Sequence, residues 1–130
     1  MYKKDPTIRP TEAELNILHV LWQRGPSTVR EVYAELSRTR SMVYTTVLKL
    51  MQIMAEKGLV QRQEEGRAHI YSASHSEESA QRRLVGDLMD RAFGGSAQKL
   101  VMQALSTRKA SAQELAEIRE LLNELEGKEQ

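Results

Sequence analysis

Three helical segments followed directly by two strand-like segments restrict the fold of this chain more than any other feature. The first two helical segments open with the same pattern, Thr-x-x-Glu, at Thr11 and Thr28. In such a capping box, the Thr hydroxyl and the Glu carboxylate each accept a backbone N–H that the first helical turn leaves unpaired. Gly58 is well placed to end the third helix in a left-handed conformation. Helical spacing predicts that one face of this third helix is buried. Its expected core residues are Val43, Val47, Leu50, Met51 and Met54.

After Gly58 the apolar pattern changes from helical spacing to partial alternation. Residues 59–63 and 68–72 are short alternating segments, and the sequence between them, Glu64-Glu65-Gly66-Arg67, is typical of a turn. Three helices followed by a β-hairpin is the order of a winged helix-turn-helix domain. In that fold the second and third helices form the helix-turn-helix unit, and the hairpin is the wing.

The charge of the chain is uneven, although the 130 residues sum to a net charge of only +1. Residues 1–74 carry eleven Lys and Arg against eight Asp and Glu, a net charge of +3, whereas residues 75–130 carry eight against ten, a net charge of −2. A basic half followed by an acidic half favours a nucleic-acid-binding module joined to a second domain. We therefore expect a winged-helix DNA-binding domain over residues 1–74 and a helical domain over residues 75–130.

Residues 76–130 form three short amphipathic helical segments. A piece of this length buries too little surface by itself, since even a domain of about 60 residues buries only about 60% of its unfolded area. Pairing two copies would bury the apolar stripes, so we expect a homodimer. The expected interface residues are Leu84, Leu88, Phe93, Leu100, Val101, Leu105, Ile118, Leu122 and Leu125. In the alternative, the protein is a monomer whose C-terminal helices pack on the winged domain. The predicted fold class is mainly α, a winged helix-turn-helix followed by an α-helical dimerisation domain.

The third helix also offers a polar face suited to DNA. If its apolar stripe is buried, Thr45, Lys49, Gln52 and Glu56 lie on the opposite side. Hydroxyl, methyl and cationic groups there suit base edges and phosphates, and the positive end of a helix favours phosphate. The expected DNA-binding residues are Arg40, Ser41, Tyr44, Thr45, Thr46, Lys49, Arg67 and His69. The alternative for the helix is an ordinary solvated face, and for Arg67 a turn residue paired with Glu64 or Glu65.

The sequence contains no pattern typical of an enzyme or a metal site. Cys is absent, which excludes disulfides, thiolate zinc sites and cysteine nucleophiles, and the three His residues lie far apart in the sequence. There is no HExxH, no Gly-rich phosphate loop and no GxSxG, so we expect no catalytic residue, no metal and no cofactor. No apolar run approaches the roughly 20 residues that span a bilayer, and the N-terminus lacks the pattern of a secretory signal. We expect a cytoplasmic protein without membrane insertion.

An ordered set of motifs between residues 9 and 126 resembles the penicillinase repressor family, the BlaI/MecI type, with the copper-responsive CopY repressors as relatives. The matching segments are TEAE at 11–14 with LW at 21–22, TVREV at 28–32, YTTV at 44–47, EKGLV at 56–60, GR at 66–67 with Tyr71, FGGS at 93–96, LV at 100–101 and EIRELL at 117–122. The resemblance implies a homodimeric transcriptional repressor. Its winged helix would bind an inverted-repeat operator, and its C-terminal helices would form the dimer interface.

The resemblance also implies that proteolysis within the C-terminal domain relieves repression in the penicillinase branch. The matching bond joins Gln103 to Ala104, but the Asn-Phe pair of the family is absent there, which leaves the inducing protease and its cutting position open. Ile53 stands where family members commonly carry Arg or another polar residue, so their base preferences do not carry over. Without Cys, thiolate copper sensing is excluded. The rival interpretation is a winged-helix protein-interaction module with only incidental DNA affinity.

Overall fold

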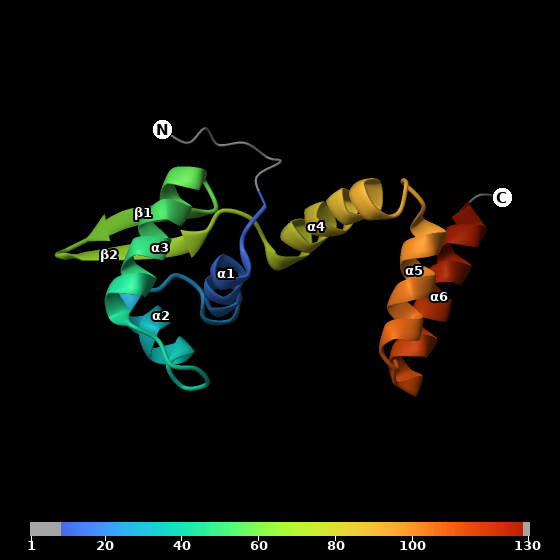
Figure 1. The fold of residues 1–130 in the computed structure, drawn as a ribbon, viewed down its shortest axis with the longest axis horizontal. Helices are drawn as coiled ribbons and strands as arrows, with labels where there is room; N and C mark the ends of the chain where they lie inside the picture. The colour runs from blue at the N-terminus through green and yellow to red at the C-terminus, as the bar shows by residue number, and fades with distance from the viewer. Residues whose placement is uncertain (1–8, 129–130) are drawn as a thin grey trace. The chain divides into compact units, whose positions relative to one another are not determined.

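The structure is a computed structural model and describes residues 9–128. This part of the chain contains six helices and one two-stranded sheet (Figure 1). The elements follow the order α1 (Glu12–Arg24), α2 (Val29–Leu36), α3 (Tyr44–Lys57), β1 (Val60–Glu65), β2 (Ala68–Ala73), α4 (Glu77–Ala92), α5 (Ala97–Thr107) and α6 (Ala112–Lys128). This order confirms the predicted fold class for its winged helix-turn-helix part and for the helical part that follows.

Both Thr-x-x-Glu patterns form the predicted capping boxes. The Thr11 amide donates to Glu14 Oε1 at 2.8 Å, and the Glu14 amide donates to Thr11 Oγ1 at 3.2 Å. The second box is equivalent: the Thr28 amide donates to Glu31 Oε1 at 2.8 Å, and the Glu31 amide donates to Thr28 Oγ1 at 3.1 Å. Gly58 ends α3 with φ 86°, a conformation that glycine adopts without the strain a side chain would bring.

The wing is an antiparallel hairpin that is tied to the helices by a third short segment. β1 and β2 pair from Val60 opposite Ala73 to the turn at Gly66, which has φ 63°. Between α1 and α2, Ser27 bridges to Tyr71 through two backbone hydrogen bonds of 2.9 and 2.8 Å. The base of the wing is therefore fixed to the helical part of the domain, while its tip extends beyond it.

Twelve buried apolar residues from α1, α2, α3 and the hairpin form one core. They are Ile17, Leu18, Val20, Leu21, Val29, Val32, Leu36, Val47, Met51, Met54, Val60 and Tyr71. Val43, predicted to lie in this core, is instead 62% exposed, so that prediction is wrong. The reason is that Val43 is the N-cap of α3 with an extended backbone, and the helical spacing that defines the buried stripe begins only one residue later. Leu50 is only half-buried, at the edge of the core.

The chain divides into two compact units, the first ending at Leu84 and the second beginning at Val85, so the division falls within α4. The start of α4 belongs to the winged unit, where Trp22 Nε1 donates to the carbonyl oxygen of His75 at 3.0 Å.

The second unit contains no fully buried side chain among the residues whose burial is described, up to 127. Eight large apolar side chains of this unit are between 38% and 62% exposed: Val85, Leu88, Val101, Met102, Leu105, Leu121, Leu122 and Leu125. None of the helices in the described chain is both long and apolar enough to cross a membrane.

Candidate nucleic-acid interface

The outer face of α3 carries the polar residues that the sequence predicts there. Thr45, Lys49, Gln52 and Glu56 are all exposed. On the inner face, Val47, Met51 and Met54 are fully buried at 0% exposure. Because three buried side chains fix the rotation of the helix about its own axis, the outer face is a preformed surface rather than a mobile one.

The N-terminus of α3 differs from those of α1 and α2 in having no side-chain cap. Its N-cap is Val43, which supplies no side-chain acceptor for the amides of the first turn. The Thr46 and Val47 amides both use the Val43 carbonyl, at 3.1 and 3.2 Å. An uncapped helix N-terminus favours an external anion such as a phosphate. Arg40 and Ser41, two of the predicted DNA-binding residues, lie exposed just before it.

Tyr44, the first residue of α3, is held by aromatic and cationic neighbours from α2. Its ring meets that of Tyr33 edge to face, with centroids 5.6 Å apart, and the guanidinium carbon of Arg30 lies 4.7 Å from the Tyr44 ring centroid. Arg30 is exposed and brings a cation beside the N-terminus of α3. Sequence reasoning missed Arg30, because its approach to Tyr44 depends on how α2 packs against α3.

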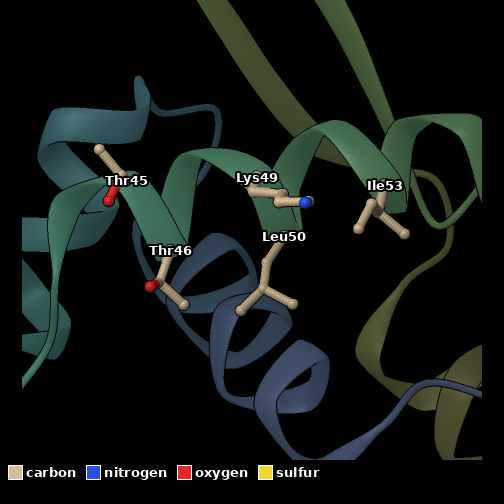
Figure 2. A pocket seen from close by; sticks show the side chains of 5 residues that line it. All are labelled: Thr45, Thr46, Lys49, Leu50 and Ile53. Atoms are coloured by element: carbon tan, nitrogen blue, oxygen red, sulfur yellow. The ribbon is translucent and has the colours of Figure 1, made fainter.

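A shallow hollow of about 330 Å³ lies on the outer side of α3. It is lined by Thr45, Thr46, Lys49, Leu50 and Ile53 (Figure 2). Three of the five are predicted DNA-binding residues, so the structure brings Thr45, Thr46 and Lys49 together. Leu50 and Ile53 add an apolar portion that was not predicted as part of this face.

The two predicted DNA-binding residues of the wing differ in their surroundings. Arg67 is exposed at the hairpin turn. In the wing, which is described throughout, no ion pair joins it to Glu64 or Glu65, so the alternative of a turn-stabilising pair finds no support. His69 lies opposite Glu64 in the hairpin register, with its Nε2 3.4 Å from Glu64 Oε1. The carboxylate of Glu64 therefore lies beside the imidazole that is predicted to contact DNA.

An ion pair lies at the junction between α1 and α2. Arg24 Nη2 lies 2.7 Å from Glu31 Oε2, and Arg24 Nε donates to Ser27 Oγ at 3.2 Å. The hydrogen bond from the backbone N–H of Thr28 is the largest effect on the pKa of Glu31 and lowers it. Burial, the next largest effect, opposes this shift, while the charge of Arg24 and the side-chain hydrogen bonds of Thr28 and Arg24 lower the pKa further. Among the described residues, no group of three His, Asp or Glu side chains is arranged to hold a metal ion.

Comparison with known proteins identifies the family. Residues 10–124 match the family described as penicillinase repressor. The chain belongs to the penicillinase repressor family. Members of this family are transcriptional repressors rather than enzymes, which agrees with the predicted absence of an enzymatic function.

Two curated members of the penicillinase repressor family resemble the chain over most of its length. The penicillinase repressor of Bacillus licheniformis is 26% identical over 122 residues, which cover 94% of each chain. The transcriptional regulator BlaI of Mycobacterium tuberculosis is 33% identical over 116 residues, covering 88% of this chain and 83% of the relative.

Solved structures agree with the winged fold of this penicillinase repressor family member. The DNA-binding domain of the repressor BlaI, solved in solution, aligns with a TM-score of 0.50 and 30% identity over 59% of this chain and 90% of that domain. A transcriptional regulator from Thermotoga maritima aligns with a TM-score of 0.51 over 90% of this chain and 74% of its own, and at 18% identity it supports the fold alone.

The predicted interface residues of this family member lie on α4, α5 and α6, except for Phe93, which directly follows α4. Leu88, Val101, Leu105, Leu122 and Leu125 are exposed, and Leu84, Phe93, Leu100 and Ile118 are half-buried. Five of the nine predicted residues are thus exposed, and the pairing of two copies through them stays a prediction.

The predicted cleavage bond of this penicillinase repressor family member lies inside a helix. Gln103 and Ala104 are exposed residues in the middle of α5. The Gln103 carbonyl oxygen accepts a hydrogen bond from Thr107 Oγ1 at 2.6 Å. A protease could reach this bond in extended form only after α5 unfolds locally.

Proposed function

We propose that this chain is a homodimeric transcriptional repressor that binds an inverted-repeat operator in double-stranded DNA. The observation that carries the proposal is the outer face of α3. There an uncapped helix N-terminus, the hydroxyls of Thr45 and Thr46 and the ammonium of Lys49 lie together on a helix fixed by three fully buried residues. Major-groove recognition by a helix-turn-helix requires such a rigid helix with polar groups near its N-terminal end.

The proposed dimer follows from the apolar side chains of the second unit. Eight large apolar residues at 38% to 62% exposure are more than an isolated helical unit leaves in water without cost. A second copy with the same stripes would cover them, and twofold symmetry would place two α3 helices on half-sites about one helical turn apart. Two basic winged units would also make more phosphate contacts than one.

The proposed cellular setting is the cytoplasm, and the proposed release mechanism is proteolysis in α5. A cut between Gln103 and Ala104 would separate α6 from the rest of the second unit and so weaken the dimer. Mass spectrometry of the repressor recovered from cells before and after target-gene induction tests this step. Induction with an intact chain, or with a cut outside α5, would rule it out.

The rival function is a protein-interaction module that uses the same α3 face and has only incidental DNA affinity. A salt titration separates the two. We expect the full-length protein to bind the region upstream of its own gene at least about 1,000-fold more tightly than random DNA at physiological salt, with affinity falling steeply as salt rises. Equal and weak binding to both DNAs would favour the rival.

Substitutions on α3 test the recognition surface directly. We expect Lys49→Ala and Thr46→Ala each to weaken operator binding by about 1–3 kcal/mol, because each removes a group placed to contact bases or phosphates. Lys99→Ala, at an exposed Lys of α5, is the charge-matched control and should leave operator affinity nearly unchanged. Normal operator binding by both α3 variants would show that α3 is not the recognition helix.

A further inference from the structure

Ile53 is an apolar side chain on α3 that the fold itself does not use. The structure describes all of α3. Of the apolar residues in it, Ile53 alone belongs neither to the buried core nor to the partly buried set that packs against the core. It is half-buried and lines the hollow on the outer side of the helix. An apolar group on a surface otherwise suited to DNA needs a reason beyond folding.

Ile53 is part of a short apolar stripe. Thr46, Leu50 and Ile53 are spaced i, i+4 and i+7, which places them along one side of the helix. Figure 2 shows Leu50 and Ile53 projecting from the same side of α3, with the ammonium of Lys49 directed toward Ile53. The stripe therefore offers methyl groups beside a single cation.

We propose that this stripe reads the C5-methyl group of thymine in the major groove, with Ile53 as the specificity-determining contact. The inference rests on the proposed function, since it requires α3 to enter the groove. Thymine is the one standard base that presents a methyl group there, so an apolar side chain at this position selects an A·T pair and its orientation.

The surroundings of the stripe favour DNA over an apolar protein partner. Lys49 is the only charged residue that lines the hollow, and its sign is complementary to phosphate. The two remaining lining residues, Thr45 and Thr46, carry hydroxyls that suit base edges or phosphates.

The length of the hollow also fits a few stacked bases. From Thr45 to Ile53 the helix advances about 12 Å at 1.5 Å per residue, or about three to four base steps of 3.4 Å. The proposed site is thus large enough for the edges of three or four neighbouring bases, with a thymine near the Ile53 end.

Replacing thymine by deoxyuridine tests this contact, because uracil pairs like thymine and lacks only the methyl group. The operator is first selected from random duplexes on the full-length protein, and each thymine of a half-site is then replaced singly. We expect at least one position at which the wild type binds the uracil operator about four-fold more weakly, the effect of one methyl group removed from an apolar contact.

The Ile53→Ala variant tests whether Ile53 makes this methyl contact. It should bind the thymine and uracil operators equally at that position, and Ile53→Val should retain part of the preference. Ile70→Ala changes an isoleucine of the wing that is also half-buried and lies outside the hollow. As the matched control it should keep the full four-fold ratio. Thermal unfolding of each variant confirms that it folds.

The outcomes separate the two proposals. Specific operator binding with no sensitivity to uracil at any position would overturn the methyl contact and leave the repressor function intact. A uracil effect that persists unchanged in Ile53→Ala would overturn the assignment to Ile53. If the wild type prefers no DNA sequence over random DNA, the proposed function fails and this inference fails with it. The same holds if the hollow binds an apolar protein instead of DNA.

Discussion

The two units of the chain differ in how completely each buries its own apolar side chains. The unit that ends at Leu84 contains all twelve buried apolar residues of the core. The unit that begins at Val85 has none among the residues whose burial is described, although its α6, at 17 residues, is longer than any helix of the first unit that precedes the wing. The lesson is that helix formation and core formation are separate requirements. Amphipathic spacing with caps is enough to form α5 and α6, but their stripes need another surface to become a core.

The first unit also buries a charged residue, whereas the second buries none among its residues up to 127. Glu14 is 1% exposed, and its Oε2 lies 2.9 Å from Lys57 Nζ. This pair joins the N-terminus of α1 to the C-terminus of α3, and Glu14 also accepts the Thr11 amide. A buried pair of this kind tolerates few alternative arrangements, so it supports one fixed orientation of α3.

The largest expected effect comes from breaking the second unit alone. Leu122→Glu places an unpaired carboxylate in the proposed interface of each copy, and burying such a charge costs several kcal/mol. Because each of the two copies brings such a charge, we expect the dimer to weaken by at least about 1,000-fold and operator affinity to fall with it, since 1.4 kcal/mol corresponds to a factor of ten. Light scattering gives the mass, and urea unfolding should show that the transition of the winged unit keeps its midpoint.

The neighbouring substitution Asn123→Glu is the matched control. It adds the same charge one residue away, at an exposed polar position of α6. In the wild type and in this control, the unfolding midpoint of the second unit should rise with protein concentration, as expected when dimerisation stabilises the folded form. Unchanged mass in Leu122→Glu would show that Leu122 does not contribute to the interface.

Much of the first unit could be predicted from sequence because its signals are local. Thr11 and Thr28 indicate where α1 and α2 begin, and each capping box involves only two residues that are three positions apart. The exposed positions of Lys49 and Gln52 follow from the spacing of the buried residues on the same helix. Val43 marks the limit of that approach, because a pattern of apolar residues does not fix the residue at which the helix begins.

The contacts that the sequence did not predict join residues far apart in the chain. Ser27 bridges to Tyr71 across 44 positions, and Lys57 reaches Glu14 across 43. Arg30 reaches the ring of Tyr44 only through the packing of α2 on α3. Neither periodicity nor capping carries information on such pairs. The apolar part of the candidate site was also missed. Leu50 lies at the border between core and surface, and the spacing of apolar residues assigned it to the core.

A smaller effect is expected from breaking the first unit at its buried pair. Glu14→Gln keeps the shape of the side chain but removes the charge that faces Lys57, so we expect the free energy of unfolding of the winged unit to fall by about 2–4 kcal/mol. Urea unfolding measures this loss, and light scattering should show an intact dimer. Glu12→Gln, at an exposed Glu of the same first turn, should cost less than about 0.5 kcal/mol. Equal losses in the two variants would mean that the Glu14–Lys57 pair contributes no more than a surface charge.

The smallest expected effect is a pH dependence confined to the first unit. Folding lowers the pKa of Glu31 from its ordinary value of 4.5, so the ionised carboxylate stabilises the winged unit at pH values above 4.5. This contribution disappears as the pH falls through the lowered pKa. We therefore expect Glu31→Gln to lower the melting temperature of the winged unit by about 2 °C at pH 7, a difference that shrinks below pH 4.5. Glu35→Gln is the control on the same helix, since Glu35 pairs with Arg38 without belonging to a capping box, and its effect should be smaller at pH 7. A Glu31→Gln difference that grows toward low pH would contradict the direction of the shift. A matching change in the transition of the second unit would contradict the separation of the two units.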